Sequence, residues 1–290
     1  MSPRVWLITG SSTGLGRAVT ELLLENGEIV VATLRKPEAL SDLITKYPAQ
    51  KLLVVQLDVK RKTDVDIAFA KAKEAFGRVD IVVNNAGYGI VAEIEGTSED
   101  RARDLFEVNF WGAAYITREA VRFFREENKP IGGRILQVSS KGAIDSNPGT
   151  GFYNASTKAL IALEGLSEAL VSELDPSWNI KITIVQPGPF RTKAPFENAI
   201  HEPPHPAYTK PDLPTIMGRA LFKLPEGNAY FNGDPKKFAA AVLKISSDEN
   251  PPLRLPLQEK TVEAMKQKIA TLSASVDEFA SWSNDLNFVD

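Results

Sequence analysis

The chain has 290 residues, of which 43% are hydrophobic and 24% charged, so it can bury a full α/β core as one domain. A net charge of -3 gives no broad basic surface for nucleic acid or an anionic membrane, and no apolar run is long enough for a membrane span. Without cysteine there can be no disulfide, thiolate nucleophile or thiolate zinc site. The histidines, His201 and His205, both lie in a proline-rich stretch that suits a loop, which leaves a Ser-His-Asp hydrolase without a base and argues against a metal site.

Short β-branched runs alternate with helical patterns up to about residue 190, which predicts βαβ units around a parallel sheet. The first strand begins almost at Met1 and leaves no room for a signal peptide, so we expect a soluble, cytoplasmic protein. The pattern predicts one doubly wound, Rossmann-type α/β domain over residues 1–290. The strands are expected at 4–9, 28–34, 51–57, 79–84, 133–139 and 180–186, and the helices at 14–26, 37–47, 63–76, 98–128 and 152–175.

The alternation breaks at residues 193–232, a proline-rich stretch with at most two short helical pieces. Irregular chain of this length inside a compact domain is usually a functional loop, so we expect a substrate-side lid insertion. Its many apolar residues favour a bulky hydrophobic ligand over a sugar or a charged acid. After it we expect a helix at 234–247, a strand at 253–255, and a C-terminal region at 257–290 with a closing amphipathic helix over 257–282.

A glycine-rich turn, Thr9-Gly-Ser-Ser-Thr-Gly-Leu-Gly16, follows the first strand and leads into the first helix. Glycines permit a tight turn and let the backbone approach a pyrophosphate, while free N–H groups of the helix face the phosphate. The G-x-x-x-G-x-G spacing at this place resembles the short-chain dehydrogenase/reductase family. The residues expected at the dinucleotide here are Gly10, Ser12, Gly14, Leu15 and Gly16.

The end of the second strand indicates which dinucleotide binds. An acidic residue about 20 positions after the glycines would hold the adenosine ribose and repel a 2′-phosphate, whereas an arginine would bind that phosphate. Here the acid is absent and Arg35 stands beside Lys36, which favours NADP(H). The alternative is a solvated pair of surface charges.

Three further segments match the family's cofactor contacts. The resemblance implies that an aspartate holds the adenine amino group, that a small-residue turn passes beside the adenosine, and that a loop after the sixth strand holds the nicotinamide amide. Taken singly, each could be a helix cap or an ordinary turn. These residues are Asp58, then Asn85, Ala86 and Gly87, then Pro187, Gly188 and Thr192.

Reduction of a ketone by a nicotinamide needs no metal if a neutral acid gives a proton to the developing alkoxide. Tyr153 stands thirteen residues after Ser140, a spacing similar to that of the family's serine and tyrosine. The resemblance implies that Ser140 holds the substrate oxygen, that Tyr153 transfers the proton, and that Asn109 braces the active-site helix and a proton-relay water. We therefore expect an NADP-dependent oxidoreductase that acts on a small hydrophobic ketone, aldehyde or secondary alcohol.

The lysine departs from the family pattern. Family members carry tyrosine and lysine four residues apart, but here Thr157 is fourth and Lys158 fifth, which rotates the lysine about 140° away on an α-helix. We favour a π-bulge that restores Lys158 to the tyrosine's face, where it would lower the tyrosine's pKa and bind the ribose. Otherwise Thr157 takes that place, and the chain is a weak enzyme or a non-catalytic dinucleotide-binding protein. The family's next helical run starts about three residues late, which is close to one turn, so its face can stay in register.

The resemblance also concerns assembly. Family members commonly pair through their long helices, which correspond here to residues 98–128 and 152–175. It therefore implies a homodimer or a homotetramer.

Overall fold

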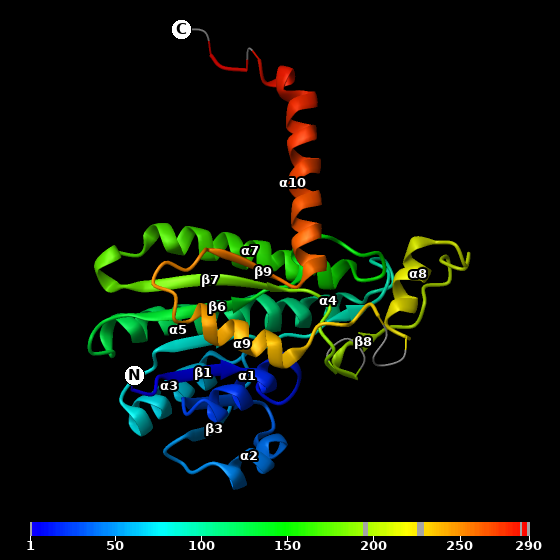
Figure 1. Ribbon diagram of the computed structural model, residues 1–290. Helices are drawn as coiled ribbons and strands as arrows, with labels where there is room; N and C mark the ends of the chain where they lie inside the picture. Colours follow the sequence, from blue (N-terminus) through cyan, green and yellow to red (C-terminus); the bar gives the residue numbers. More distant parts are fainter. Residues whose placement is uncertain (1, 194–196, 225–228, 285, 289–290) are drawn as a thin grey trace.

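The computed structural model describes residues 2–193, 197–224, 229–284 and 286–288, and for residues 157–163 it describes the backbone only. Within this part of the chain, seven parallel strands form one sheet in the order β3-β2-β1-β4-β6-β7-β9 (Figure 1). The chain winds outward from β1 to β3 and then crosses to β4 and winds the other way, which confirms the predicted doubly wound fold. The strands are β1 (Val5–Thr9), β2 (Ile29–Leu34), β3 (Leu52–Gln56), β4 (Ile81–Asn84), β6 (Gly133–Val138), β7 (Ile180–Pro187) and β9 (Arg254–Leu257).

Helices cover both faces of the sheet, and each face has its own apolar core. In β1, Trp6 and Ile8 belong to one core and Val5 and Leu7 to the other, because successive side chains of a strand point to opposite faces. The helices are α1 (Gly14–Glu25), α2 (Ser41–Lys46), α3 (Lys62–Phe76), α4 (Glu99–Phe106), α5 (Ala113–Glu126), α6 (Lys141–Ile144), α7 (Gly151–Glu173), α8 (Pro214–Leu221), α9 (Pro235–Ile245) and α10 (Glu259–Phe279). Short 3-10 turns lie at η1 (Pro37–Leu40), η3 (Pro176–Trp178) and η5 (Ala280–Ser283).

The helix predicted over residues 98–128 is interrupted. A π-helical turn, η2 (Glu107–Gly112), joins α4 to α5 and contains Asn109. The sequence predicted one continuous helix because the residues on both sides of this turn have helical apolar spacing. Gly112 ends this turn against Val59, where a Cβ would lie only 2.7 Å from the valine Cγ2.

The π-bulge predicted near Thr157 is wrong, because α7 is α-helical from Gly151 to Glu173. The three additional residues are close to one full turn, so the helix can return Glu164 and Ser167 to its buried face without a bulge. The side chains of Thr157 and Lys158 lie outside the described residues, so the choice between them stays open.

The described parts of segment 193–232 contain one short strand and one helix. The strand β8 (Ile200–His201) pairs in parallel with β5 (Ile90–Val91), and α8 follows it. Asn198, just before β8, reaches the glycine-rich loop through its side chain. The described parts of the segment therefore lie at the carboxyl end of the sheet.

The predicted C-terminal helix exists, but it does not close over the body. After β9 the chain turns at Gln258, whose φ is 81°, and α10 then projects away from the sheet (Figure 1). Along its outer part, large apolar side chains such as Leu272 are more than half exposed, at 54%. A search of the described helices finds none that is long and apolar enough to cross a membrane.

Candidate active site

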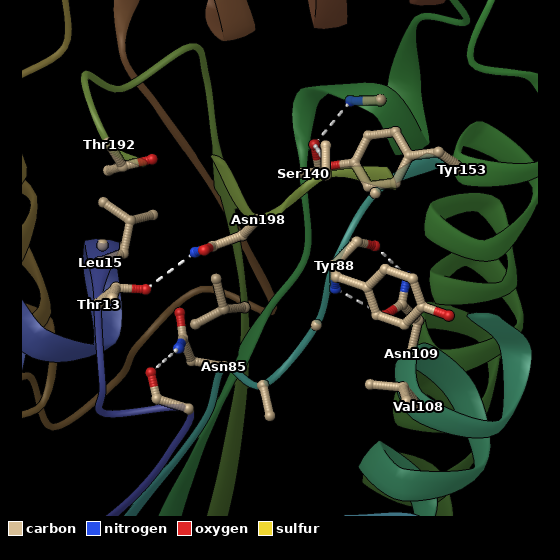
Figure 2. A pocket seen from close by; sticks show the side chains of 18 of the residues that line it. Thr13, Leu15, Asn85, Tyr88, Val108, Asn109, Ser140, Tyr153, Thr192 and Asn198 are labelled. Carbon is tan, nitrogen blue, oxygen red and sulfur yellow. Dashed lines mark hydrogen bonds between the residues drawn. The ribbon is translucent and has the colours of Figure 1, made fainter. Parts of the chain in front are cut away.

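A cavity of about 800 Å³ lies at the carboxyl ends of the strands, where doubly wound sheets bind their ligands. The glycine-rich loop, the turns after β2, β3, β4, β6 and β7, and the described part of segment 193–232 line it. Figure 2 shows part of this lining, from the glycine-rich loop to Ser140 and Tyr153. Every predicted site residue lines this cavity except Gly16, which lies behind the loop, and Lys158, whose side chain lies outside the described residues. The structure thus brings together residues from across more than half of the chain.

The glycine-rich loop has the backbone that a pyrophosphate requires. Gly10 and Gly14 adopt φ values of 71° and 61°, in the region that favours glycine. Gly16 lets the helix approach the strand, because a Cβ there would lie 2.4 Å from the Gly10 carbonyl oxygen. The N-cap residue Thr13 gives α1 no side-chain cap, so the first N–H groups of the helix remain available to an anion.

The floor of the cavity is held by hydrogen bonds between β1 and the turn after β4. The Thr9 hydroxyl accepts the backbone N–H groups of Asn85 and Ala86, both at 2.9 Å. The Asn85 side chain donates back to the Thr9 carbonyl at 2.9 Å. These bonds fix the point at which the strand order reverses, and they place Ala86 and Gly87 along the cavity wall.

The adenosine side of the cavity contains Arg35 and Asp58. Arg35 is exposed, and among the described residues it forms no ion pair, so its guanidinium is available to a phosphate. Asp58 accepts the backbone N–H of Lys60 at 3.1 Å and so also caps the turn before α3. Because Asp58 caps this turn and also lines the cavity, the cap does not exclude the adenine contact that the family resemblance implies.

Ser140 and Tyr153 point into the cavity as a pair (Figure 2). The Tyr153 hydroxyl donates to Ser140 Oγ at 3.4 Å, and Ser140 Oγ also accepts the Gly142 N–H at 3.0 Å as the N-cap of α6. The tyrosine ring packs against Gly89, where a Cβ would lie 3.4 Å from the ring. A carbonyl oxygen placed beside both hydroxyls would meet two donors at once.

Burial raises the pKa of the Tyr153 phenol above its ordinary value, and the hydrogen bond with Ser140 opposes this only in part. The phenol therefore stays protonated at neutral pH, which is the form that a proton donor needs. A nearby cation would lower this pKa, and the residue predicted to supply one, Lys158, lies outside the described side chains.

Asn109 joins three segments behind the catalytic pair. Its Nδ2 donates to the Tyr88 carbonyl at 3.0 Å and to Ser156 Oγ at 2.9 Å, and its Oδ1 accepts the Tyr88 N–H at 3.1 Å. The side chain is buried. It therefore ties the π turn, the loop after β4 and α7 together, as a brace for the helix that carries Tyr153 would.

Sequence reasoning missed Tyr88 and Asn198. The Tyr88 hydroxyl donates to Asp104 Oδ2 at 2.8 Å beside the cavity, and its place directly after the predicted Gly87 was a usable signal. Asn198 Nδ2 donates to the Thr13 hydroxyl at 3.0 Å (Figure 2). No local pattern marks Asn198, because the contact joins residues 185 positions apart.

Comparisons with known proteins agree with this geometry. A family model described as short chain dehydrogenase matches residues 4–201. The chain is 41% identical over 262 residues to the uncharacterized oxidoreductase C162.03 of Schizosaccharomyces pombe, which covers 90% of this chain and 84% of that protein. It is 35% identical over 254 residues to the 3-ketodihydrosphingosine reductase of Bacteroides thetaiotaomicron, which covers 88% of this chain and 87% of that protein.

The solved structure of a short-chain dehydrogenase from Streptomyces avermitilis superposes with a TM-score of 0.86. It is 36% identical and covers 99% of this chain and 100% of that one. The similarity thus extends through the cavity and beyond it. The chain therefore belongs to the short-chain dehydrogenase family of oxidoreductases, and its cavity is a site for a nicotinamide dinucleotide.

Proposed function

We propose that this protein is an NADPH-dependent carbonyl reductase and alcohol dehydrogenase for hydrophobic ketones, aldehydes and secondary alcohols. The observation that carries the proposal is that the paired hydroxyls of Ser140 and Tyr153 and the available guanidinium of Arg35 line one cavity. The nicotinamide, when bound, supplies or accepts the hydride. The chain's own residues bind the dinucleotide, orient the carbonyl and move the proton.

The preference for NADPH rests on Arg35. A guanidinium forms a charge-assisted pair with a phosphate, and no acidic residue stands at the end of β2 to repel the 2′-phosphate. The phosphates of the bridge would meet the N–H groups at the start of α1 and the Ser12 backbone. Asp58, Asn85 and Thr192 are proposed to hold the adenine, the adenosine and the nicotinamide amide.

The proton transfer belongs to the hydroxyl pair. Ser140 holds the carbonyl oxygen, and the Tyr153 phenol gives its proton to that oxygen as negative charge develops there. In the reverse direction the phenolate takes the proton back from the alcohol. Asn109 keeps α7 in place through Ser156, so that the phenol stays within reach of Ser140.

The substrate side of the cavity is apolar. Ile90 and Val91 of β5, Ile200 of β8, and Phe222 and Phe231 line it. A bulky hydrophobic ketone fits such a lining better than a sugar or a charged acid. The relative from Bacteroides thetaiotaomicron is named for a keto substrate, which supports the same class.

Residues 193–232 are proposed to act as the lid of this pocket, within a single domain of residues 1–290. Support comes from Ile200, Phe222 and Phe231, which line the cavity, and from Asn198, which reaches Thr13. A lid that excludes water would strengthen the hydrogen bonds to the substrate oxygen. Assembly as a homodimer or homotetramer and location in the cytoplasm remain predictions from the sequence.

The test measures oxidation of NADPH and of NADH by the protein with a panel of long-chain and polycyclic ketones, sugars and charged 2-keto acids. We expect turnover with NADPH and the hydrophobic ketones, and little with the sugars and acids. Tight binding of NADPH without turnover of any member would favour the non-catalytic alternative. Equal use of the two dinucleotides would contradict the role of Arg35.

A further inference from the structure

The C-terminal helix α10 carries an apolar face that nothing else in the described chain covers. The helix contacts α6 and β9 near its base, and its outer part projects from the body (Figure 1). Along this outer part, Ile269, Leu272, Val276 and Phe279 are exposed by 60%, 54%, 67% and 48%. Large apolar side chains so exposed and so close together usually mark an interaction surface.

The spacing of these residues is regular. Together with Val262 and Met265, which are partly buried at the base, they are separated by steps of three, four, three, four and three residues. This is the 3-4 repeat of a coiled coil, in which apolar residues occupy positions a and d of each heptad. We call these six residues the α10 seam: Val262, Met265, Ile269, Leu272, Val276 and Phe279.

We propose that the α10 seam binds the same seam of a second copy of this chain, as a two-stranded coiled coil. The residue types support this number of strands. The a positions, Val262, Ile269 and Val276, are all β-branched, whereas Leu272 occupies a central d position. In parallel coiled coils, β-branched residues at a with leucine at d favour two strands over three or four.

The residues that flank the seam permit the pairing. Position e is filled by Lys266, Ser273 and Ala280, and position g by Thr261, Lys268 and Ser275. In an in-register parallel pair, residue g of one helix faces residue e of the next heptad of the other. Thr261 is buried in the body, but in the projecting part Lys268 then meets Ser273 and Ser275 meets Ala280, so no like charges face each other there.

The helix itself needs a partner. The projecting part of α10 contains several β-branched residues and serines, which are weaker helix formers than alanine, and most helical stability in proteins comes from packing of the apolar face. A membrane surface is a poorer partner, because α10 carries four carboxylates against three lysines, and membrane-surface helices are rich in cations. A second copy of the same seam provides apolar contacts along the whole exposed length.

The proposed interface does not depend on the enzymatic proposal, and it differs from pairing through α4, α5 and α7. Its test measures molar mass by sedimentation equilibrium for the wild type and two double variants. Ile269→Glu with Leu272→Glu places two charges in the seam. Ala270→Glu with Ala274→Glu places the same two charges on exposed positions of the same helix, outside the seam.

We expect the seam variant to have half the molar mass of the wild type, whether the wild type is a dimer or a tetramer, and the control variant to keep the wild-type mass. Thermal unfolding of the body, followed by near-ultraviolet circular dichroism, shows whether each variant is folded. Val276→Glu, a single change further out, should also reduce the mass if the double variant fails to fold.

Retention of the wild-type mass by a folded seam variant would overturn the proposal, as would a wild type that has the mass of one chain at the highest concentration reached. Co-sedimentation with phosphatidylcholine and phosphatidylserine vesicles tests whether a membrane surface covers this face instead of a second copy. A single-chain wild type that binds these vesicles, while the seam variant does not, would assign the face to a membrane surface and contradict the coiled coil.

Discussion

Tyr153 has opposite requirements in the two directions of the proposed reaction. Reduction of a ketone needs the neutral phenol, and oxidation of an alcohol needs the phenolate. Burial raises the pKa of this phenol above its ordinary value of about 10, so the neutral form dominates over the physiological range. The pocket as described therefore favours reduction, and a cation close to the phenol would be needed for efficient oxidation near neutral pH.

The pH dependence of alcohol oxidation shows which residue supplies that cation. A cation stabilises the phenolate and lowers the pKa of Tyr153, so its removal raises that pKa. We expect Lys158→Ala to move the midpoint of the oxidation rate to higher pH and to weaken NADPH binding through the lost ribose contact. Thr157→Ala should leave the midpoint unchanged. The opposite result for the two variants would assign the position to Thr157.

The proposed preference for NADPH rests on Arg35. Replacement by aspartate removes the charge-assisted pair with the 2′-phosphate and adds repulsion, so we expect Arg35→Asp to weaken NADPH binding by roughly 10- to 100-fold and to reverse the preference toward NADH. Fluorescence titration of both dinucleotides measures the effect. Lys36→Asp serves as the neighbouring control, and if it had the larger effect, the assignment to Arg35 would be wrong.

Sequence reasoning found residues whose roles depend on local spacing. Gly10, Ser140 and Tyr153 stand at fixed distances from strand ends, and the fold brings these ends together. It did not find Asn198, whose contact with Thr13 depends on how a long irregular segment folds back over the sheet. Such contacts are set by tertiary packing and leave no periodic signal.

At the scale of the elements, one buried ion pair attaches segment 193–232 to the body. Glu93, after β5, accepts a hydrogen bond from Arg219 of α8 at 3.0 Å, and both side chains are nearly inaccessible to solvent. The same carboxylate accepts the His205 N–H at 3.2 Å and the Thr215 hydroxyl at 3.4 Å. One carboxylate therefore holds three points of the segment.

The charge of Glu93 is essential to this attachment. Burial works to raise the pKa of the carboxyl, but backbone hydrogen bonds and the charge of Arg219 outweigh it and lower the pKa. The folded-state pKa is thus below the unfolded value. The stabilisation is present above the unfolded pKa and is lost as the pH falls through the folded pKa, so the attachment is complete at neutral pH.

We expect Glu93→Gln to loosen this segment, because the substitution leaves the Arg219 guanidinium buried without its counter-charge. Breaking a buried pair in this way costs about 3–5 kcal/mol. Limited proteolysis should show faster cleavage within 193–232, and NADPH plus a bound ketone should restore part of the protection. Glu99→Gln, an exposed glutamate whose partner Arg103 lies on the same helix α4, is the matched control. Equal cleavage of all three proteins would show that the pair does not hold the segment.

The main helices and strands were predictable because their apolar periodicity extends over several turns or residues. The pair β5 and β8 was not, since two residues carry no measurable alternation. The π turn at Glu107–Gly112 was missed because ordinary helical spacing precedes and follows it, in α4 and α5. The bulge expected in α7 does not occur. Three added residues nearly complete a turn, so the helix keeps its register without a bulge.

At the scale of the whole molecule, the strand order reverses between β1 and β4, and the cavity there is lined by the predicted cofactor and catalytic residues other than Gly16 and Lys158. The sequence allowed this arrangement to be predicted, because alternating strands and helices restrict the topology severely. It gave no reason to expect that α10 would leave the body. An amphipathic pattern shows that one face of a helix is apolar, but not which surface covers that face.

In the proposed reaction Tyr153 donates the proton while the rest of the site binds the dinucleotide. The most direct test compares NADPH affinity with turnover of a hydrophobic ketone in the wild type and in Tyr153→Phe. We expect turnover to fall by at least ~100-fold while NADPH affinity stays nearly unchanged, because only the acidic hydroxyl is removed. Near-wild-type turnover by a Tyr153→Phe variant that still binds NADPH would contradict this role of Tyr153.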